Sequence, residues 1–232
     1  RYTKAMTEEG MMSKEPGEQV APALFVEEDA ETASKRAADL IGGVISACSA
    51  PVLALPAGRT PIKVFEELVR QHGEGGLSFQ KAHLFQLDEW WPLAPDDPVA
   101  FRSFLETHLL KKVDVNRDQV HFLEATASAE EVAPLCAAYE QAMVDAGGLD
   151  LAFLGLGSNG HVAFNEPGSA STSRTRLVDI SLDTLALASQ TFEGREEAPT
   201  QGETMGIETL AEARQILLLA TGSAKAHAAA FF

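Results

Sequence analysis

The feature that most constrains this chain is a short apolar run that ends in glycines. Residues 149–154 read Leu-Asp-Leu-Ala-Phe-Leu and follow Gly147 and Gly148. A short, nearly continuous apolar run of this kind is typical of a strand buried on both faces, as in a parallel sheet. The next residues, 155–160, read Gly-Leu-Gly-Ser-Asn-Gly and predict a tight turn. The run therefore predicts one strand of an open α/β sheet.

The same order of strand, turn and helix recurs along the chain. Further strands are predicted at 23–26, 51–55, 82–87, 119–123 and 216–219, and the stretch 173–180 is interpreted as a basic patch that runs into a strand. Helical spacing of apolar residues predicts helices at 29–45, 62–69, 100–110, 129–145 and 181–192. Because strands and helices alternate without a repeat or linker, we predict an α/β fold in three layers. It is a doubly wound, Rossmann-like, mainly parallel sheet with helices on both faces.

Both ends of the chain depart from this pattern. Residues 1–20 are polar, rich in Met and Glu, and without periodicity, so they predict a loose N-terminal arm. Residues 21–232 predict a single domain. The sequence begins at Arg1 and stops at Phe232 inside a predicted helix, and an apolar end of this kind suggests that C-terminal residues are missing.

The charge balance argues against several classes of partner. The 232 residues include 18 Lys and Arg against 34 Asp and Glu, a formal net charge of −16. Such a surface repels nucleic acid and anionic membranes, so we expect neither as a partner. No transmembrane run or signal segment is evident, and Cys48 and Cys136 lie in helical patterns as free thiols, so a cytoplasmic protein is expected.

Two predicted strand ends carry residues suited to chemistry. Residues 58–61, Gly-Arg-Thr-Pro, join a strand to a helix, where unpaired N–H groups and the helix dipole favour an anion. An ordinary strand-to-helix turn is the alternative. Asp88 and Glu89 precede two tryptophans, and an apolar wall with a second negative charge would raise a carboxyl pKa toward that of a general base. A helix cap or loop carboxylate is the alternative.

Two later strand ends complete the set. His161 and Glu166 follow the strand at 149–154, and residues 221–225 form a second glycine turn that ends in Lys225. Ligands bind beyond the carboxyl ends of the strands in open α/β sheets, so these groups are candidates for one site. His83, His121 and His227 are interpreted as ordinary strand or helix residues. For Arg174 and Arg176 the alternative to a functional role is a surface patch of ion pairs.

Five motifs, taken together and in order, resemble the glucosamine-6-phosphate deaminase/isomerase family. They are Gly-Arg-Thr-Pro at 58–61, Leu-Asp-Glu-Trp at 87–90, Ser-Asn-Gly-His through Ser at 158–169, Ser-Arg-Thr-Arg at 173–176 and Thr-Gly-x-x-Lys-Ala at 221–226. The family is related to galactosamine-6-phosphate deaminases and 6-phosphogluconolactonases. The tetrad Phe-Asn-Glu-Pro at 164–167 favours the deaminase branch.

The resemblance implies that an amino-sugar phosphate ring is opened, a proton moves between carbons 1 and 2, and ammonia leaves. It implies a small sugar-phosphate substrate and neither a metal nor another cofactor. Asp88 would be the base for the carbon-bound proton, and His161, oriented by Glu166, would open the ring. Gly58, Arg59, Thr60 and Lys225 would hold the phosphate, with Gly160 also assigned to substrate binding. A homo-oligomer is possible and is left open.

Three positions depart from the family pattern. Asn159 stands where an Asp is usual, and because Asn carries no charge, His161 should be less basic. Asn is also seen there in galactosamine-6-phosphate deaminase-like relatives. Gln190 stands where an Arg normally reaches the phosphate, and Arg59 replaces a small residue, so we hypothesise that Arg59 supplies the missing cation.

Three functions remain open on the sequence. The first is a hexosamine-6-phosphate deaminase that acts on glucosamine 6-phosphate first and galactosamine 6-phosphate second. The second is a 6-phosphogluconolactonase, which needs a histidine to activate water and makes no demand on Asp88. The third is a sugar-phosphate-binding protein without catalysis, which Asn159 and Gln190 keep open.

Overall fold

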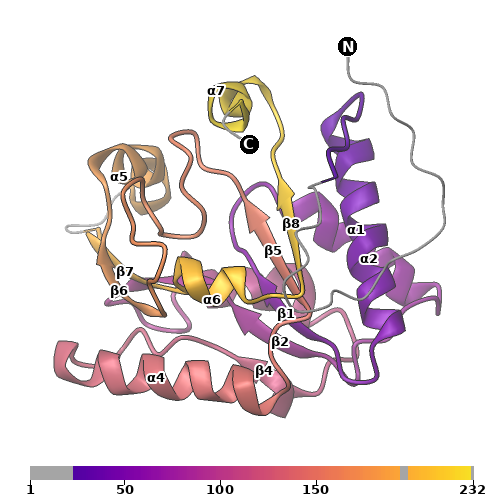
Figure 1. The fold of residues 1–232 in the computed structure, drawn as a ribbon, viewed down its shortest axis with the longest axis horizontal. Coiled ribbons are helices and arrows are strands. Elements are labelled where there is room, and N and C mark those ends of the chain that lie inside the picture. The colour runs from indigo at the N-terminus through magenta and orange to yellow at the C-terminus, as the bar shows by residue number, and fades with distance from the viewer. Residues whose placement is uncertain (1–22, 194–197, 231–232) are drawn as a thin grey trace.

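Five parallel strands form the central sheet of the computed structural model, which describes residues 23–193 and 198–230 (Figure 1). Their order across the sheet is β4-β2-β1-β5-β8, and each neighbouring pair is parallel. The strands are β1 (Val52–Leu55), β2 (His83–Gln86), β4 (Val120–His121), β5 (Leu151–Gly155) and β8 (Gln215–Leu219). This is the doubly wound parallel sheet that the apolar runs predict.

Side chains alternate between the two faces of each strand, and both faces of this sheet are covered, which explains why the runs are apolar at successive positions. In β1, Leu53 and Leu55 face a core shared with α1 (Ala30–Ala47) and α2 (Ile62–Gly73). Val52 and Ala54 face the opposite core, which includes Tyr139 and Met143 of α4 (Ala129–Asp145). Because successive side chains point to opposite faces, only a strand covered on both sides needs every position apolar. Figure 1 shows α1 and α2 on one side of the sheet and α4 on the other.

The long helices begin where their sequence signals predict. Asp29 caps α1, with its side chain accepting from the Thr32 N–H at 2.8 Å. Ser128 and Glu131 form a capping box at the start of α4. The remaining helical elements are α3 (Phe101–Leu105), a π-helical turn (Glu106–Leu110), α5 (Leu182–Ala188), α6 (Ile207–Ala211), α7 (Ala226–Ala229) and 3-10 turns at Arg117–Gln119, Ser189–Phe192 and Ser223–Lys225.

A second, antiparallel sheet lies beside the first and is absent from the sequence prediction. It has the order β3-β7-β6, with β3 (Asp88–Trp91), β7 (Gln201–Thr204) and β6 (Arg176–Asp179). The sequence predicts 88–91 as a strand end and places 201 and 202 in a loop. Both predictions are wrong because these polar segments gain pairing partners only in the folded chain. Trp90 of β3 packs on Phe164 and Phe192 in a separate small core.

The predicted strand at 23–26 is also wrong. These residues form no strand, and Leu24 and Val26 are exposed. The segment lies beside α1, where the Arg36 guanidinium sits 4.9 Å from the centre of the Phe25 ring. In the described part of the chain, neither edge strand of the sheet pairs with it. The predicted arm at 1–20 and the end at Phe232 lie outside the described residues.

The two cysteines are free thiols, as predicted. Cys48 follows α1, and Cys136 lies within α4, where burial raises its pKa to about 12. Among the described helices, none combines the length and the apolarity that crossing a bilayer requires.

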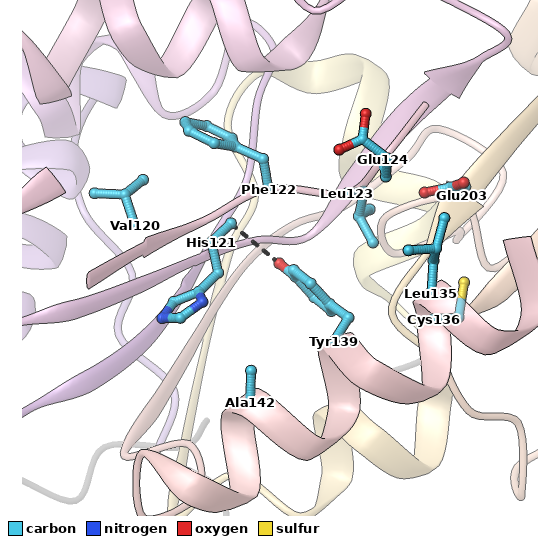
Figure 2. A pocket seen from close by; sticks show the side chains of 10 residues that line it. All are labelled: Val120, His121, Phe122, Leu123, Glu124, Leu135, Cys136, Tyr139, Ala142 and Glu203. Atoms are coloured by element: carbon cyan, nitrogen blue, oxygen red, sulfur yellow. Dashed lines mark hydrogen bonds between the residues drawn. The ribbon is translucent and has the colours of Figure 1, made fainter. Parts of the chain in front are cut away.

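A pocket of about 340 Å³ lies between α4 and the segment that continues from β4 (Figure 2). Its polar lining includes Glu203 of β7, whose side chain is 1% exposed, together with Glu124. One oxygen of Glu203, Oε1, has no hydrogen-bond partner among the described residues. Burial, and then the charges of Glu124 and Glu89, raise the pKa of Glu203 to about 7. The pocket therefore holds a carboxyl group that is costly to ionise.

We predict that Glu203→Gln stabilises the fold at alkaline pH. The folded chain holds a proton on Glu203 between the ordinary pKa of 4.5 and about 7, so the free energy of unfolding falls as pH rises through this window. Urea unfolding at pH 5 and at pH 8 measures how far the free energy of unfolding falls between the two. This fall should be smaller in the variant than in the parent chain by roughly 2 kcal/mol. The exposed control Glu66→Gln should keep the parent's full loss. An equal loss in Glu203→Gln contradicts the prediction.

Candidate active site

The four predicted turns meet because four neighbouring strands end at the same edge of the sheet. Asp88 follows β2, the Gly58 turn follows β1, the His161 turn follows β5 and Lys225 follows β8. The chain order reverses between β1 and β5, which is where open α/β sheets bind ligands. In Figure 1 β5 and β8 point toward α5 and α7, which flank this edge.

Asp88 is a buried carboxylate at the start of β3. The residue is 7% exposed, and no side chain or N–H among the described residues donates a hydrogen bond to its carboxylate. Burial, followed by the negative charge of Glu89, raises the pKa of Asp88 well above its ordinary value. A carboxylate in this environment is suited to accept a proton.

Glu89, the next residue, differs from Asp88 in its hydrogen bonding. Its carboxylate accepts four hydrogen bonds, from the Gln86 amide and from the N–H groups of Trp90, Phe101 and Arg102, at 2.8 to 2.9 Å. Two of these donors belong to the first turn of α3, so Glu89 satisfies the helix N-terminus. The two neighbouring carboxylates therefore differ in their hydrogen bonds. Burial raises the pKa of Glu89 as well, but its four hydrogen bonds oppose this, whereas Asp88 has no such donor among the described residues.

The turn after β5 is shaped around His161. The Gly157 N–H donates to the His161 carbonyl at 2.8 Å, and Gly160 has a φ of 94°, which favours glycine. A Cβ on Gly157 would lie 2.5 Å from three atoms of the imidazole ring, so the ring packs directly on this glycine. The two glycines therefore give His161 both its backbone turn and its ring position.

Asn159 links the backbone of this turn to Glu166. Its Oδ1 accepts the His161 N–H at 3.1 Å, while its Nδ2 donates to Glu166 Oε2 at 2.8 Å. The amide thus serves an acceptor and a donor role at once. An aspartate here would set two carboxylates against each other unless one held a proton.

Glu166 is held as an anion by its donors. Its other oxygen, Oε1, accepts from the Ser181 hydroxyl at 2.8 Å and the Thr184 hydroxyl at 2.6 Å. Burial alone would raise the pKa of Glu166, but the hydrogen bonds from Thr184, Ser181 and Asn159 outweigh it and lower the pKa. His161 Nδ1 lies 3.7 Å from Oε2.

The imidazole of His161 is neutral near pH 7. Burial lowers its pKa below 6.5, the charge of Glu166 partly opposes this, and Lys225 lowers the pKa further. A neutral imidazole can accept a proton, so His161 is suited to general-base chemistry.

Strand β7 ties the His161 turn to Asp88. Thr204 pairs with Asp88 in the antiparallel register, and its hydroxyl accepts the Phe164 N–H at 3.1 Å. The Asn165 amide donates to the Met205 carbonyl at 2.8 Å. The two candidate catalytic segments are therefore held against one short strand, which the sequence does not predict.

The opposite side of the edge carries the cations. Gly58 has a φ of 110°, and α2 begins after Pro61 without a side-chain cap, which leaves N–H groups of its first turn available to an anion. Burial and then the charge of Arg59 lower the pKa of Lys225. Arg59 and Lys225 therefore lie within electrostatic range of each other, and neither has an ion pair among the described residues. Thr60 lies in the same turn, partly buried.

Other candidates lie outside this group. Arg174 pairs with Glu208 and Glu212 on the surface, which agrees with the ion-paired alternative, whereas Arg176 donates to Asn165 Oδ1 at 3.0 Å. His83 and His121 stack against each other on the sheet, with ring centres 5.9 Å apart. The side chain of Gln190 is outside the described part of the structure.

Ser181 and Thr184 are the site residues that the sequence prediction misses. Ser181 caps α5, with its hydroxyl accepting the Thr184 N–H at 3.2 Å. The spacing Ser-x-x-Thr at a helix start indicates a cap, but no local signal says that the same hydroxyls reach Glu166, 15 and 18 residues earlier.

Two proteins with similar sequences are named glucosamine-6-phosphate deaminases. The chain is 42% identical over 200 residues to a glucosamine-6-phosphate deaminase of Rhodopirellula baltica, covering 86% of this chain and 79% of that protein. It is 41% identical over 208 residues to glucosamine-6-phosphate deaminase 1 of Giardia intestinalis, covering 89% and 77%.

Solved structures agree on the fold. A monomeric glucosamine-6-phosphate deaminase superposes with a TM-score of 0.83 at 32% identity, covering 87% of this chain and 83% of that one. The 6-phosphogluconolactonase of Thermotoga maritima superposes with a TM-score of 0.69 at 20% identity, covering 90% and 87%, and this likeness concerns the fold alone.

The family model described as glucosamine-6-phosphate isomerases/6-phosphogluconolactonase matches residues 26–231, nearly the whole described chain. With relatives above 40% identity over most of both chains, the assignment does not depend on the motifs alone. The chain belongs to the glucosamine-6-phosphate isomerase/6-phosphogluconolactonase family.

Proposed function

We propose that this chain is a glucosamine-6-phosphate deaminase, which converts glucosamine 6-phosphate and water into fructose 6-phosphate and ammonia. The observation that carries the proposal is the pair of Asp88 and His161 at one sheet edge, in environments that suit different proton transfers. The similarity to named deaminases at 41–42% identity supports the same reaction.

His161 opens the sugar ring in this proposal. Opening requires a proton to leave the hydroxyl on carbon 1 and a proton to reach the ring oxygen, so one group must both accept and donate. A neutral imidazole, whose pKa burial lowers from its ordinary value, can accept the first proton and donate the second. Glu166 stays anionic and stabilises the imidazolium that forms between the two transfers.

Asp88 moves the carbon-bound proton. It takes the proton from carbon 2 of the open-chain sugar and returns it to carbon 1, while a proton of the amino group passes to the oxygen on carbon 1. This leaves an imine at carbon 2, which water hydrolyses to the ketone and ammonia. A raised carboxyl pKa makes Asp88 a stronger base than an exposed aspartate. Because Glu89 is fully hydrogen-bonded, the role falls to Asp88.

The phosphate lies at the cationic side of the edge. In a chain of net charge −16, a dianion has to be held by local groups, since the overall field repels it. The Gly58 and Thr60 turn offers N–H groups at the start of α2, and Arg59 and Lys225 supply positive charge. Gly160, in the turn beside His161, leaves backbone open to the sugar.

Glucosamine 6-phosphate ranks first as substrate and galactosamine 6-phosphate second. The named relatives support the first epimer. Asn159 is the reason to retain the second, because it stands where the family usually has an aspartate and because its amide contacts both Glu166 and the His161 backbone. The assay described next also distinguishes this function from the two alternatives, a lactonase and a sugar-phosphate-binding protein without turnover.

We predict ammonia release from glucosamine 6-phosphate at a higher kcat/KM than from galactosamine 6-phosphate. Both substrates and 6-phosphogluconolactone are assayed side by side with the parent chain and with Asp88→Asn, which should lower kcat by roughly a hundredfold or more. Acid release from the lactone without ammonia would identify a lactonase. Binding of either sugar phosphate with no turnover would identify a binding protein, and both results would overturn the proposal.

We predict that Arg59→Ala raises the KM for glucosamine 6-phosphate by roughly tenfold or more, because a charge-assisted contact to the phosphate is lost. Steady-state kinetics and competition by inorganic phosphate measure the effect. Lys63→Ala is the matched control, since this exposed cation on α2 pairs with Glu31 and should leave KM unchanged. An unchanged KM in Arg59→Ala would refute the phosphate role.

A further inference from the structure

Thr184 lies between the carboxylate of Glu166 and the imidazole of His161. Its hydroxyl oxygen is 2.6 Å from Glu166 Oε1 and 3.3 Å from His161 Nδ1. The residue is buried in the first turn of α5, where its own N–H is bonded to the Ser181 hydroxyl. The Ser181 hydroxyl also lies 3.1 Å from the Thr184 hydroxyl, so the position of that hydroxyl is set by the helix start as well as by Glu166 and His161.

The single hydroxyl proton of Thr184 belongs to the carboxylate. An ionised carboxylate can only accept, and the contact to Oε1 is the shorter of the two and is charge-assisted. The Thr184 oxygen then presents a lone pair to Nδ1 of His161. That contact is a hydrogen bond only when Nδ1 carries a proton.

A second contact also favours a proton on Nδ1, and a third fixes the plane of the ring. The negative charge of Glu166 Oε2, itself held by the Asn159 amide, lies 3.7 Å from Nδ1 and favours a proton there. The imidazole face packs on Gly157, where even a Cβ would come within 2.5 Å of the ring. The ring plane is therefore fixed, and no hydrogen bond from a described residue reaches Nε2.

We propose that Thr184 is a positioning residue that fixes the tautomer of His161, with the proton on Nδ1 and Nε2 left free as the base. The catalytic consequence rests on the proposed function, since it names the nitrogen that accepts the proton of the sugar hydroxyl. The tautomer itself is a property of the free chain and does not depend on any substrate.

The test reads the tautomer directly by NMR. Histidines are labelled with ¹⁵N in the parent chain, and ring correlations are recorded at a pH well above 6.5, where His161 is neutral. The signals that disappear in His161→Gln belong to His161. We expect Nδ1 to carry the proton in the parent chain; a proton on Nε2 overturns the proposal.

Three variants separate the hydroxyl from the fold around it. Thr184→Val removes the hydroxyl at nearly constant shape and should let the form protonated on Nε2 appear. Thr184→Ser should restore the parent spectrum. Thr209→Val is the matched control, because it removes a buried threonine hydroxyl that bonds a different carboxylate, that of Glu140, and it should keep the parent tautomer. An unchanged spectrum in Thr184→Val contradicts the proposal.

Kinetics connect the tautomer to the reaction. Thr184→Val should lower kcat for ammonia release by roughly tenfold to a hundredfold with little change in KM, and Thr184→Ser should recover most of it. If the parent chain releases no ammonia, the proposed function fails while the NMR result still decides the tautomer. If the tautomer shifts in Thr184→Val and kcat does not change, the positioning role is refuted.

Discussion

The parallel pairing of β2, β1, β5 and β8 is the constraint on which the rest of the structure depends. Parallel strands place their carboxyl ends at one edge, so four turns that are far apart in the sequence become neighbours there. The pairing is possible because each strand is apolar on both faces and is covered by α1 and α2 on one side and by α4 on the other. Asp88, Arg59, His161 and Lys225 owe their proximity to this register rather than to contacts with one another.

Three carboxylates at or near this edge differ in the hydrogen-bond donors around them. Glu89 accepts four hydrogen bonds and is committed to the α3 terminus. Glu166 accepts from Asn159, Ser181 and Thr184, and these donors lower its pKa despite burial. Asp88 has no such donor among the described residues, and its pKa is raised. Burial raises the pKa of Glu89 as well, although its four hydrogen bonds oppose this. Each pKa therefore reflects the balance of burial against donors, and among these three carboxylates the donors outweigh burial in Glu166 alone.

The sequence predicts the parts of the fold that local pattern controls. Strand β1 follows from Leu53 and Leu55 alternating with Val52 and Ala54, and α1 follows from the Asp29 cap. The antiparallel sheet is not predictable in this way. Gln201–Thr204 is polar and short, and it becomes a strand only because β3 and β6 offer edges on both sides. The run at 23–26 differs in the opposite way: its apolar pattern predicts a strand, but no strand of the described residues pairs with it.

The residues of the candidate site also fall into those that local sequence predicts and those that depend on the folded chain. Residues that follow a strand directly, such as Asp88 and His161, are visible as motifs because the turn and the chemistry share one stretch of sequence. Ser181 and Thr184 are not, since a helix cap and a carboxylate donor look alike until the chain folds. Arg59 and Lys225 have no ion pair with any residue of the ranges 23–193 and 198–230, which a strongly acidic composition does not predict.

The central claim is that one buried carboxylate carries a proton between adjacent carbons of an amino-sugar phosphate. Glucosamine 6-phosphate labelled with deuterium at carbon 2 tests it most directly. We predict a slower reaction than with the unlabelled sugar and deuterium at carbon 1 of the fructose 6-phosphate formed, with both effects lost in Asp88→Asn. Ammonia released without transfer of any label to carbon 1, and at an unchanged rate, would contradict it.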